Sequence, residues 1–349
     1  MIGTLLVLAL LGAPAPAVPA GLSPDAAYAL VVRAALSRDP LPKPEQLAAA
    51  RKVLEPQAAR EPRAGRWAYA LAHVARAEAE QAKGDLAEKK RKEALERFAQ
   101  AAELQPKDPD TQVWLGMASF ERIDDVGMLS KMSLASDGRK AFEKAIALDA
   151  GNVGGRVGLA QFYLQAPSIA GGSVDKAKQM GNELLAIPGR RGEFQGHMVL
   201  AAIAAEGSSW AEMSRHYTAA ETAQGEGAAP LTAMQAHASA LLGKKKDPKA
   251  ALPVMARYVQ AAPADDVSAW YFDGEIKRDG GKYAEALVRY EQVLGKVEGA
   301  RGSRWGAAVC QEKLGNKAAA RTHYQEFARR FPDDPRTKEA QAALKRLTL

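Results

Sequence analysis

Two segments near the C-terminus carry the same pattern of small and aromatic residues at a spacing of 34 positions. The matched pairs are Gly274 with Ala308, Ala286 with Ala320, and Tyr290 with Tyr324. A fixed period of this length is typical of a repeated helix–turn–helix unit. A single unit cannot bury its apolar face, so such units stack into a solenoid. We therefore expect an extended surface for holding a partner rather than an enclosed catalytic pocket.

The composition favours helices that pack through small side chains. Of the 349 residues 47% are hydrophobic, many of them alanine, and only 6% are aromatic. No segment sustains the alternation of apolar and polar residues that predicts a β-strand. We therefore predict an all-α superhelix of about seven helix–turn–helix units with additional terminal helices.

The N-terminal segment has features of an export signal. An apolar run from Leu5 to Leu11 is followed by alternating alanines and prolines up to Ala20. Small residues at this spacing suit a signal peptidase, and the apolar run is shorter than the roughly 20 residues of a membrane span. The absence of Lys and Arg before it is atypical. We expect residues 1–20 to be a signal peptide, the protein to be periplasmic or secreted, and no transmembrane span elsewhere.

The remaining chain divides into a cap, an array and a final helix. Residues 21–63 predict an N-terminal helical cap, with one helix from Pro24 to about Ser37 and another from Pro44 to about Arg60. Residues 64–333 form the predicted repeat array, and residues 334–349 contain a C-terminal capping helix.

Two repeats in the middle of the array are longer than the others. The extra residues lie near 122–138 and near 166–172. Met128 and Met132 fall on one helical face of the first insertion. Together with Met117 they either fill an irregular part of the core or form an adaptable apolar surface, and core filling is the simpler interpretation.

The combined pattern resembles the tetratricopeptide repeat. A Trp or Leu precedes a small residue on the first helix, and Ala-x3-aromatic-x2-Ala on the second helix is closed by proline. The match is best at 267–332, good at 85–106 and looser between them. The stretch from Trp114 to Ala177 is similar to a group of exported bacterial repeat proteins with no settled activity. The resemblance implies that the first helices line a concave side, where a protein partner or an extended peptide would lie.

Candidate contacts for such a partner are first-helix positions that the stacking does not use. They are Met117, Phe120, Gln161, Tyr271, Glu275, Arg278, Trp305 and Lys313. We expect Tyr271 and Trp305 to be aromatic anchors, and Arg278 and Lys313 to hold acidic or carboxylate groups. The alternative for Trp305 is packing between repeats.

The chain lacks the patterns that enzyme chemistry requires. No two of its five histidines are four residues apart, so a His-x3-His zinc pair is absent. The glycines at 154–158 do not form a phosphate-binding loop, and the single cysteine, Cys310, lies in a helical pattern. We predict a non-enzymatic protein without a metal or a cofactor.

The net positive charge of the chain is compatible with weak binding of anions. The net charge is +7, but the densest basic runs, at 89–92 and 244–246, contain no aromatic residues, so we predict no nucleic-acid partner. Gly171, Gly172 and Ser173 open a helix, where free N–H groups can bind an anion. The simpler interpretation is a flexible turn followed by a serine cap. The alternative function is therefore binding of a small ligand or an anionic polymer, in transport or envelope upkeep.

Overall fold

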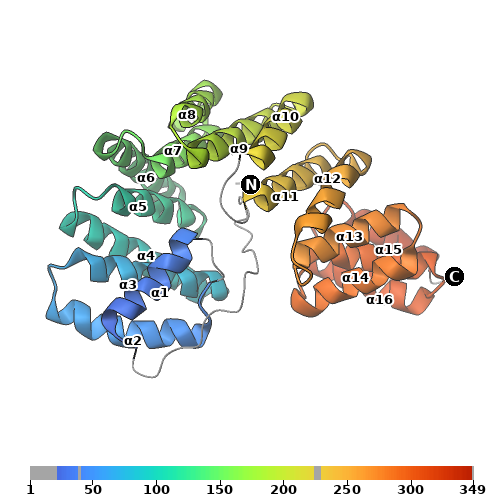
Figure 1. Ribbon diagram of the computed structural model, residues 1–349. Coiled ribbons are helices and arrows are strands. Elements are labelled where there is room, and N and C mark those ends of the chain that lie inside the picture. The colour runs from blue at the N-terminus through green and yellow to red at the C-terminus, as the bar shows by residue number, and fades with distance from the viewer. Residues whose placement is uncertain (1–21, 38–40, 224–228, 348–349) are drawn as a thin grey trace. The chain divides into compact units, whose positions relative to one another are not determined.

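The computed structural model describes residues 22–37, 41–223 and 229–347, and every regular element in these ranges is a helix (Figure 1). The expected signal peptide lies outside the described residues. The two cap helices have the predicted bounds, α1 at Pro24–Ser37 and α2 at Pro44–Arg60. Both begin with proline, whose missing N–H group costs nothing in the first turn of a helix.

The other helices follow in chain order as seven predicted repeats and a final helix. They are α3 (Gly65–Gln81) and α4 (Asp85–Leu104), α5 (Pro109–Glu121) and α6 (Met128–Leu148), α7 (Val153–Gln165) and α8 (Val174–Ala186), α9 (Arg190–Glu206) and α10 (Trp210–Thr222), α11 (Ala229–Gly243) and α12 (Pro248–Ala261), α13 (Val267–Asp279) and α14 (Tyr283–Lys296), α15 (Arg301–Lys313) and α16 (Lys317–Arg330), and α17 (Thr337–Arg346). Short 3-10 helices, η1 (Ile123–Asp125) and η2 (Ser168–Ala170), occupy the two insertions.

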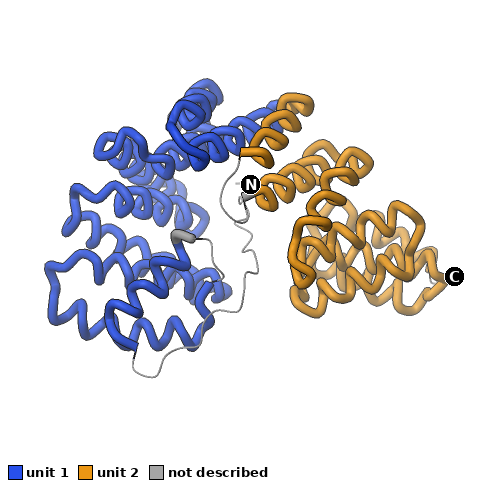
Figure 2. Tube along the Cα trace, viewed as in Figure 1, with its two compact units in different colours: residues 1–207 blue, residues 208–349 orange. Residues whose placement is uncertain are grey.

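The chain divides into two compact units, residues 1–207 and residues 208–349 (Figure 2). The division falls between α9 and α10, inside the segment for which the sequence predicts a fourth hairpin. Nothing in the repeat pattern indicates a division at this point.

Within each unit, helices that follow one another pack side by side. Thus α3 packs on α4, α5 on α6, α13 on α14, and α15 on α16. First helices of adjacent hairpins also meet, α5 with α7 and α13 with α15, more extensively than the second helices do. The first helices therefore lie on the inner side of each stack, as expected for superhelical repeats.

An aromatic residue of the second helix fills the space between two first helices. A β-carbon at Gly274 would lie 2.9 Å from the ring of Tyr290, and one at Gly306 would lie 2.4 Å from it. Only glycine allows both first helices to approach this ring so closely. The same arrangement recurs in unit 1 with Phe142, Gly116 and Gly158. The predicted role of the small and aromatic positions is therefore confirmed.

The first insertion extends α6 beyond the core. The helix begins at Met128, but its first buried residue is Gly138. Met128 and Met132 are 73% and 55% exposed. Core filling is therefore the wrong interpretation for these two methionines, because the part of the helix that carries them lies outside the packed interior.

Candidate functional site

The predicted contact residues of unit 1, Met117, Phe120 and Gln161, are all half-buried, and the two apolar ones pack against its core. Phe120 stacks on Phe162 with ring centres 6.1 Å apart and also meets the edge of Phe142. Met117 packs against the same cluster, and Gln161 is half-buried on α7. Phe120 is thus positioned between hairpins, where it stabilises their stacking.

The structure brings together the three predicted residues of α13 in unit 2. Tyr271, Glu275 and Arg278 lie on successive turns, and the carboxylate of Glu275 is at their centre. Its Oε1 atom accepts a 2.8 Å hydrogen bond from the Tyr290 hydroxyl, and its Oε2 atom accepts one of 2.6 Å from Arg278. Glu275 is only 6% exposed. Glu275 therefore orients the Arg278 side chain from the protein interior, and its own carboxylate is not accessible to a partner.

Burial controls the ionisation of this group. Loss of hydration raises the pKa of Glu275 above its ordinary value, although Arg278 and the Tyr290 hydroxyl act in the opposite direction. Burial alone would lower the pKa of Arg278, but the adjacent Glu275 carboxylate more than compensates and the net shift is upward. Arg278 therefore stays charged.

Two further arginines, which the sequence pattern did not indicate, join Arg278 around Tyr271. Burial and the Glu275 carboxylate raise the pKa of Tyr271, and the positive charges of Arg278, Arg336 and Arg301 oppose this shift. Arg301 opens α15, and Arg336 immediately precedes α17. We call Tyr271 and these three arginines the arginine cluster.

The arginine cluster, taken together with the carboxylates that contact it, has a net positive charge. Asp334, buried at the start of the last segment, pairs with Arg336 at 3.0 Å and with Arg301 at 3.4 Å. Glu275 pairs with the remaining arginine. Three guanidinium groups therefore face two carboxylates. The side chains of Arg278, Arg336 and Arg301 are 24%, 34% and 59% exposed, so solvent reaches all three.

Trp305 is a packing residue and does not present its ring to a partner. It is 8% exposed, with Tyr324 and Phe327 at 5.5 and 5.2 Å between ring centres. The guanidinium of Arg336 lies 5.6 Å from the centre of its ring. The expectation of an exposed anchor is thus wrong, and packing between repeats is correct. Lys313 is exposed at the end of α15.

The backbone of the Gly171–Ser173 turn is committed to internal hydrogen bonds. The N–H groups of Gly171, Gly172 and Ser173 donate to the carbonyls of Ser168, Pro167 and Tyr163, respectively. The Ser173 hydroxyl accepts from the N–H of Lys176 at 3.3 Å. An anion would have to displace these bonds, so the geometry corresponds to a turn and a serine cap.

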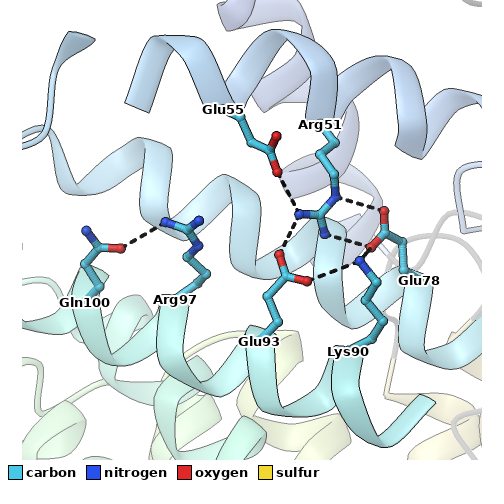
Figure 3. A network of polar contacts seen from close by, with 7 residues as sticks. All are labelled: Arg51, Glu55, Glu78, Lys90, Glu93, Arg97 and Gln100. Atoms are coloured by element: carbon cyan, nitrogen blue, oxygen red, sulfur yellow. Dashed lines mark hydrogen bonds and ion pairs between the residues drawn. The ribbon is translucent and has the colours of Figure 1, made fainter. Parts of the chain in front are cut away.

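A network of ion pairs, also not indicated by the sequence, joins the cap to the first hairpin (Figure 3). Arg51 of α2 forms two hydrogen bonds to Glu78 of α3, at 3.0 and 2.7 Å, and one to Glu93 of α4 at 2.5 Å. Lys90 binds Glu78 at 2.7 Å. Burial alone would raise the pKa of Glu78 and Glu93. The hydrogen bonds from Arg51 and Lys90 have the larger opposite effect, so the pKa of both carboxyl groups is below its ordinary value.

A cavity of about 320 Å³ lies beside this network, between α2, α3 and α4. Its lining includes the charged residues Glu55, Glu61 and Arg97 and the apolar residues Trp67 and Leu71. These two apolar residues are 1% and 0% exposed, so the cavity offers a ligand little apolar surface.

One group of side chains in unit 2 has the order of a catalytic triad, in which a nucleophile, a base and an acid follow one another: Ser214, His237 and Glu221. The Ser214 hydroxyl is 3.1 Å from Nε2 of His237, but Nδ1 is 3.6 Å from Glu221, which is too long for a hydrogen bond. Glu221 instead accepts two hydrogen bonds from Arg257, at 2.9 and 3.1 Å. These contacts link α10, α11 and α12. Across the described ranges, no group of His, Cys, Asp and Glu side chains could hold a metal ion.

Comparison with known proteins agrees with the repeat geometry. Residues 278–344 match the family model of the tetratricopeptide repeat. No curated protein sequence matches the chain. None of the helices in the described part of the chain has the length and apolar character of a membrane span.

Several solved structures share the fold at low sequence identity. Yeast Tom70 has a TM-score of 0.60 and 15% identity, with 87% of this chain and 59% of Tom70 covered. The human IFIT1 dimer with m7Gppp-AAAA has a TM-score of 0.53 and 16% identity, with 93% and 71% covered. PilF of Pseudomonas aeruginosa has a TM-score of 0.51 and 13% identity, with 67% and 96% covered.

These observations define an all-helical superhelical repeat protein. The described part of the chain has the fold of a tetratricopeptide-repeat solenoid, and residues 278–344 carry the sequence pattern of that family. This fold typically serves protein–protein interaction, and its members are generally non-enzymatic scaffolds.

Proposed function

We propose that the protein is a non-enzymatic scaffold that holds an extended segment of a partner protein on the inner side of unit 2. The arginine cluster is the observation that carries this proposal. Its three arginines come from the first helices α13 and α15 and from the residue before α17; Arg301 and Arg336 share the Asp334 carboxylate, and all three act electrostatically on Tyr271. Arginine binds carboxylates through paired hydrogen bonds, so a partner with acidic side chains or a free C-terminal carboxylate fits this surface.

Fluorescence anisotropy with labelled acidic peptides tests this function. Each peptide is prepared with a free C-terminal carboxylate and, separately, with a C-terminal amide. Replacing Arg301 by Gln should weaken binding by more than about fivefold, a loss expected for a contact of this kind. Arg278 and Arg336 are left intact because they compensate the charges of Glu275 and Asp334, whose side chains are only 7% and 5% exposed.

Arg329→Gln is the matched control. Arg329 lies on the second helix α16 and its side chain is 67% exposed, so its replacement removes a positive charge from another face of unit 2. Its binding should stay within about twofold of the parent chain, because exposed ion pairs contribute little. Equal losses in both variants would mean that net charge, and not the arginine cluster, determines binding.

The second candidate function is binding of an anionic polymer at the same surface. The excess positive charge of the arginine cluster favours it, and salt separates the two functions. Binding of a polyanion should fall steeply with ionic strength, because binding releases counterions. A peptide held mainly by apolar and backbone contacts should lose much less affinity.

We also infer that the protein acts outside the cytoplasm. The apolar run at 5–11 and the small residues up to Ala20 support export. Mass spectrometry of the native protein should then show an N-terminus near Gly21. Recovery of the chain with Met1 intact from the cell envelope would contradict this inference.

A further inference from the structure

The first insertion presents an apolar helical surface that none of the described residues of unit 1 covers. In α6, residues 128–137 precede the first buried residue, Gly138. Met128, Leu129 and Met132 are 73%, 84% and 55% exposed. Single exposed apolar residues are common on proteins, but three within one turn and a half of a helix form an apolar cluster of the kind found at binding surfaces.

The second insertion, in the next hairpin, also carries exposed apolar residues. Ile169 in η2 is 94% exposed, and Val174 at the start of α8 is 52% exposed. Each insertion connects the first helix of its hairpin to the second, η1 between α5 and α6 and η2 between α7 and α8. Because these hairpins are neighbours in a stack of repeats, their turns lie at the same end of the stack.

Aromatic contacts beneath the two insertions link them. A β-carbon at Gly138 would lie 2.6 Å from the ring of Phe120, and one at Gly171 would lie 3.7 Å from the ring of Phe162. These two rings stack on each other. We call residues 128–132 together with Ile169 and Val174 the insertion edge.

The insertion edge is almost free of charge. Residues 126–136 contain a single charged residue, Lys131, and residues 157–174 contain none, in a chain that is 26% charged. Lys131 is 33% exposed and lies 3.5 Å from Asp124. Moving this edge out of water therefore desolvates few charges.

The high exposure of these side chains distinguishes between kinds of partner. A residue that lines a groove is partly covered by the walls of the groove, whereas Leu129 and Ile169 are almost entirely uncovered. A protein partner would need a complementary pocket for each projecting side chain. A lipid bilayer needs none, because its interface deforms around apolar groups.

We propose that the insertion edge of unit 1 binds the surface of a lipid bilayer. Met128, Leu129, Met132 and Ile169 enter the boundary between headgroups and acyl chains. Lys131 extends its amino group to the lipid phosphates while its methylene groups remain among the apolar side chains. Because the edge has so little charge, zwitterionic phosphatidylcholine is sufficient as the binding surface.

Co-sedimentation of the full chain with phosphatidylcholine vesicles tests this proposal. The variant Met128→Ser, Leu129→Ser, Met132→Ser and Ile169→Ser should bind at least about tenfold more weakly, because it removes most of the apolar area that enters the interface. Its helicity and melting temperature should be unchanged, since all four residues are exposed. The matched control is Leu86→Ser with Val288→Ser, which removes exposed apolar residues, 55% and 53% accessible, from other places. It should bind as the parent does.

A fluorescent label locates the contact independently of residues 1–20. Leu129→Cys is labelled with an environment-sensitive dye, and Val288→Cys is labelled for comparison; the native Cys310 is fully buried. Vesicles should shift the emission of the first label to shorter wavelength and leave the second unchanged. The shift should change by less than about twofold between low and high salt.

Three results would overturn the proposal. One is the absence of a spectral shift at position 129. Another is equal sedimentation of the parent and the serine variant. A third is a dimer of the parent that the serine variant converts to a monomer in solution, since a second copy would then cover the edge.

Discussion

The hydroxyl of Tyr290 donates a 2.8 Å hydrogen bond to the buried carboxylate of Glu275. The same tyrosine ring fills the space between Gly274 and Gly306. One side chain of α14 therefore packs two first helices together and supplies a donor to the charged group that orients Arg278. Stacking and the candidate site of unit 2 are thus coupled through this residue.

Tyr290→Phe isolates the hydrogen bond from the packing. The ring is retained, but the buried Glu275 carboxylate loses a donor, so unfolding should be easier by about 1.5–3 kcal/mol. Urea denaturation followed by circular dichroism measures this difference. Tyr324→Phe is the control, since the Tyr324 hydroxyl donates to Glu312, whose side chain is 22% exposed. Its cost should stay below about 1 kcal/mol because water replaces the donor.

Gly306→Ala tests the close approach of α15 to the Tyr290 ring. The added methyl group would lie 2.4 Å from the ring and should lower the free energy of unfolding by about 1–3 kcal/mol. Gly295→Ala in α14 is the control, because no atom lies within 4 Å of its β-carbon position. This change should raise stability by roughly 0.5–1 kcal/mol through helix propensity. A neutral effect of Gly306→Ala would argue against the packing seen here.

Arg51→Met tests the ion-pair network of unit 1. It leaves Glu78 and Glu93 without their main partner and should cost on the order of 3 kcal/mol, at the low end for buried pairs because the side chains are 18–26% exposed. The pKa of both glutamates lies below the ordinary value of 4.5 in the folded chain. Their contribution is therefore complete above that pH and is lost as the pH falls through the lowered values.

Thermal melts of the parent and of Arg51→Met between pH 7 and pH 3 measure the contribution of these two glutamates to stability. The parent chain should lose stability below about pH 4.5 more steeply than Arg51→Met does. Parallel melting profiles of the two chains would show that the ion pairs contribute nothing. Lys52→Met, a change at the neighbouring exposed position, is the control and should leave the profile unchanged.

His73→Phe tests the cost of a buried imidazole. His73 is enclosed by Tyr69, Phe98 and Trp114, and neither of its ring nitrogens has a hydrogen-bond partner. Replacement by a ring of similar shape should raise stability at pH 7 by about 1 kcal/mol, because the orphan nitrogens disappear. A loss of stability would indicate that the imidazole makes a favourable contact in this cluster.

The same variant should change the response to acid. Burial lowers the pKa of His73 from 6.5 to about 3. The unfolded chain therefore binds a proton between these values while the folded chain does not, so stability falls as the pH drops through this window. His73→Phe should lose less stability than the parent between pH 6.5 and pH 4, measured by urea denaturation.

The sequence by itself determined the repeat and the bounds of the two cap helices. A period of 34 residues, the prolines that open α1 and α2, and the small and aromatic positions of α13 to α16 are local features that each segment carries alone. The role of Tyr290 between two small residues followed from the same pattern, because the geometry of a helical hairpin is fixed by its own residues.

Only the tertiary structure decided which side chains are exposed and which charges meet. Trp305 and Tyr271 occupy equivalent positions one period apart, and neither is the fully exposed anchor that the sequence pattern predicts. Trp305 is covered by Tyr324, Phe327 and Arg336, and Tyr271 is half-buried against Tyr290 and Gly302. Arg336 reaches the surroundings of Tyr271, although they are far apart in sequence. Helix patterns describe the faces of one element, whereas burial and ion pairing depend on how separate elements stack. For the same reason, the methionines of the first insertion had the pattern of core residues but lie on the surface.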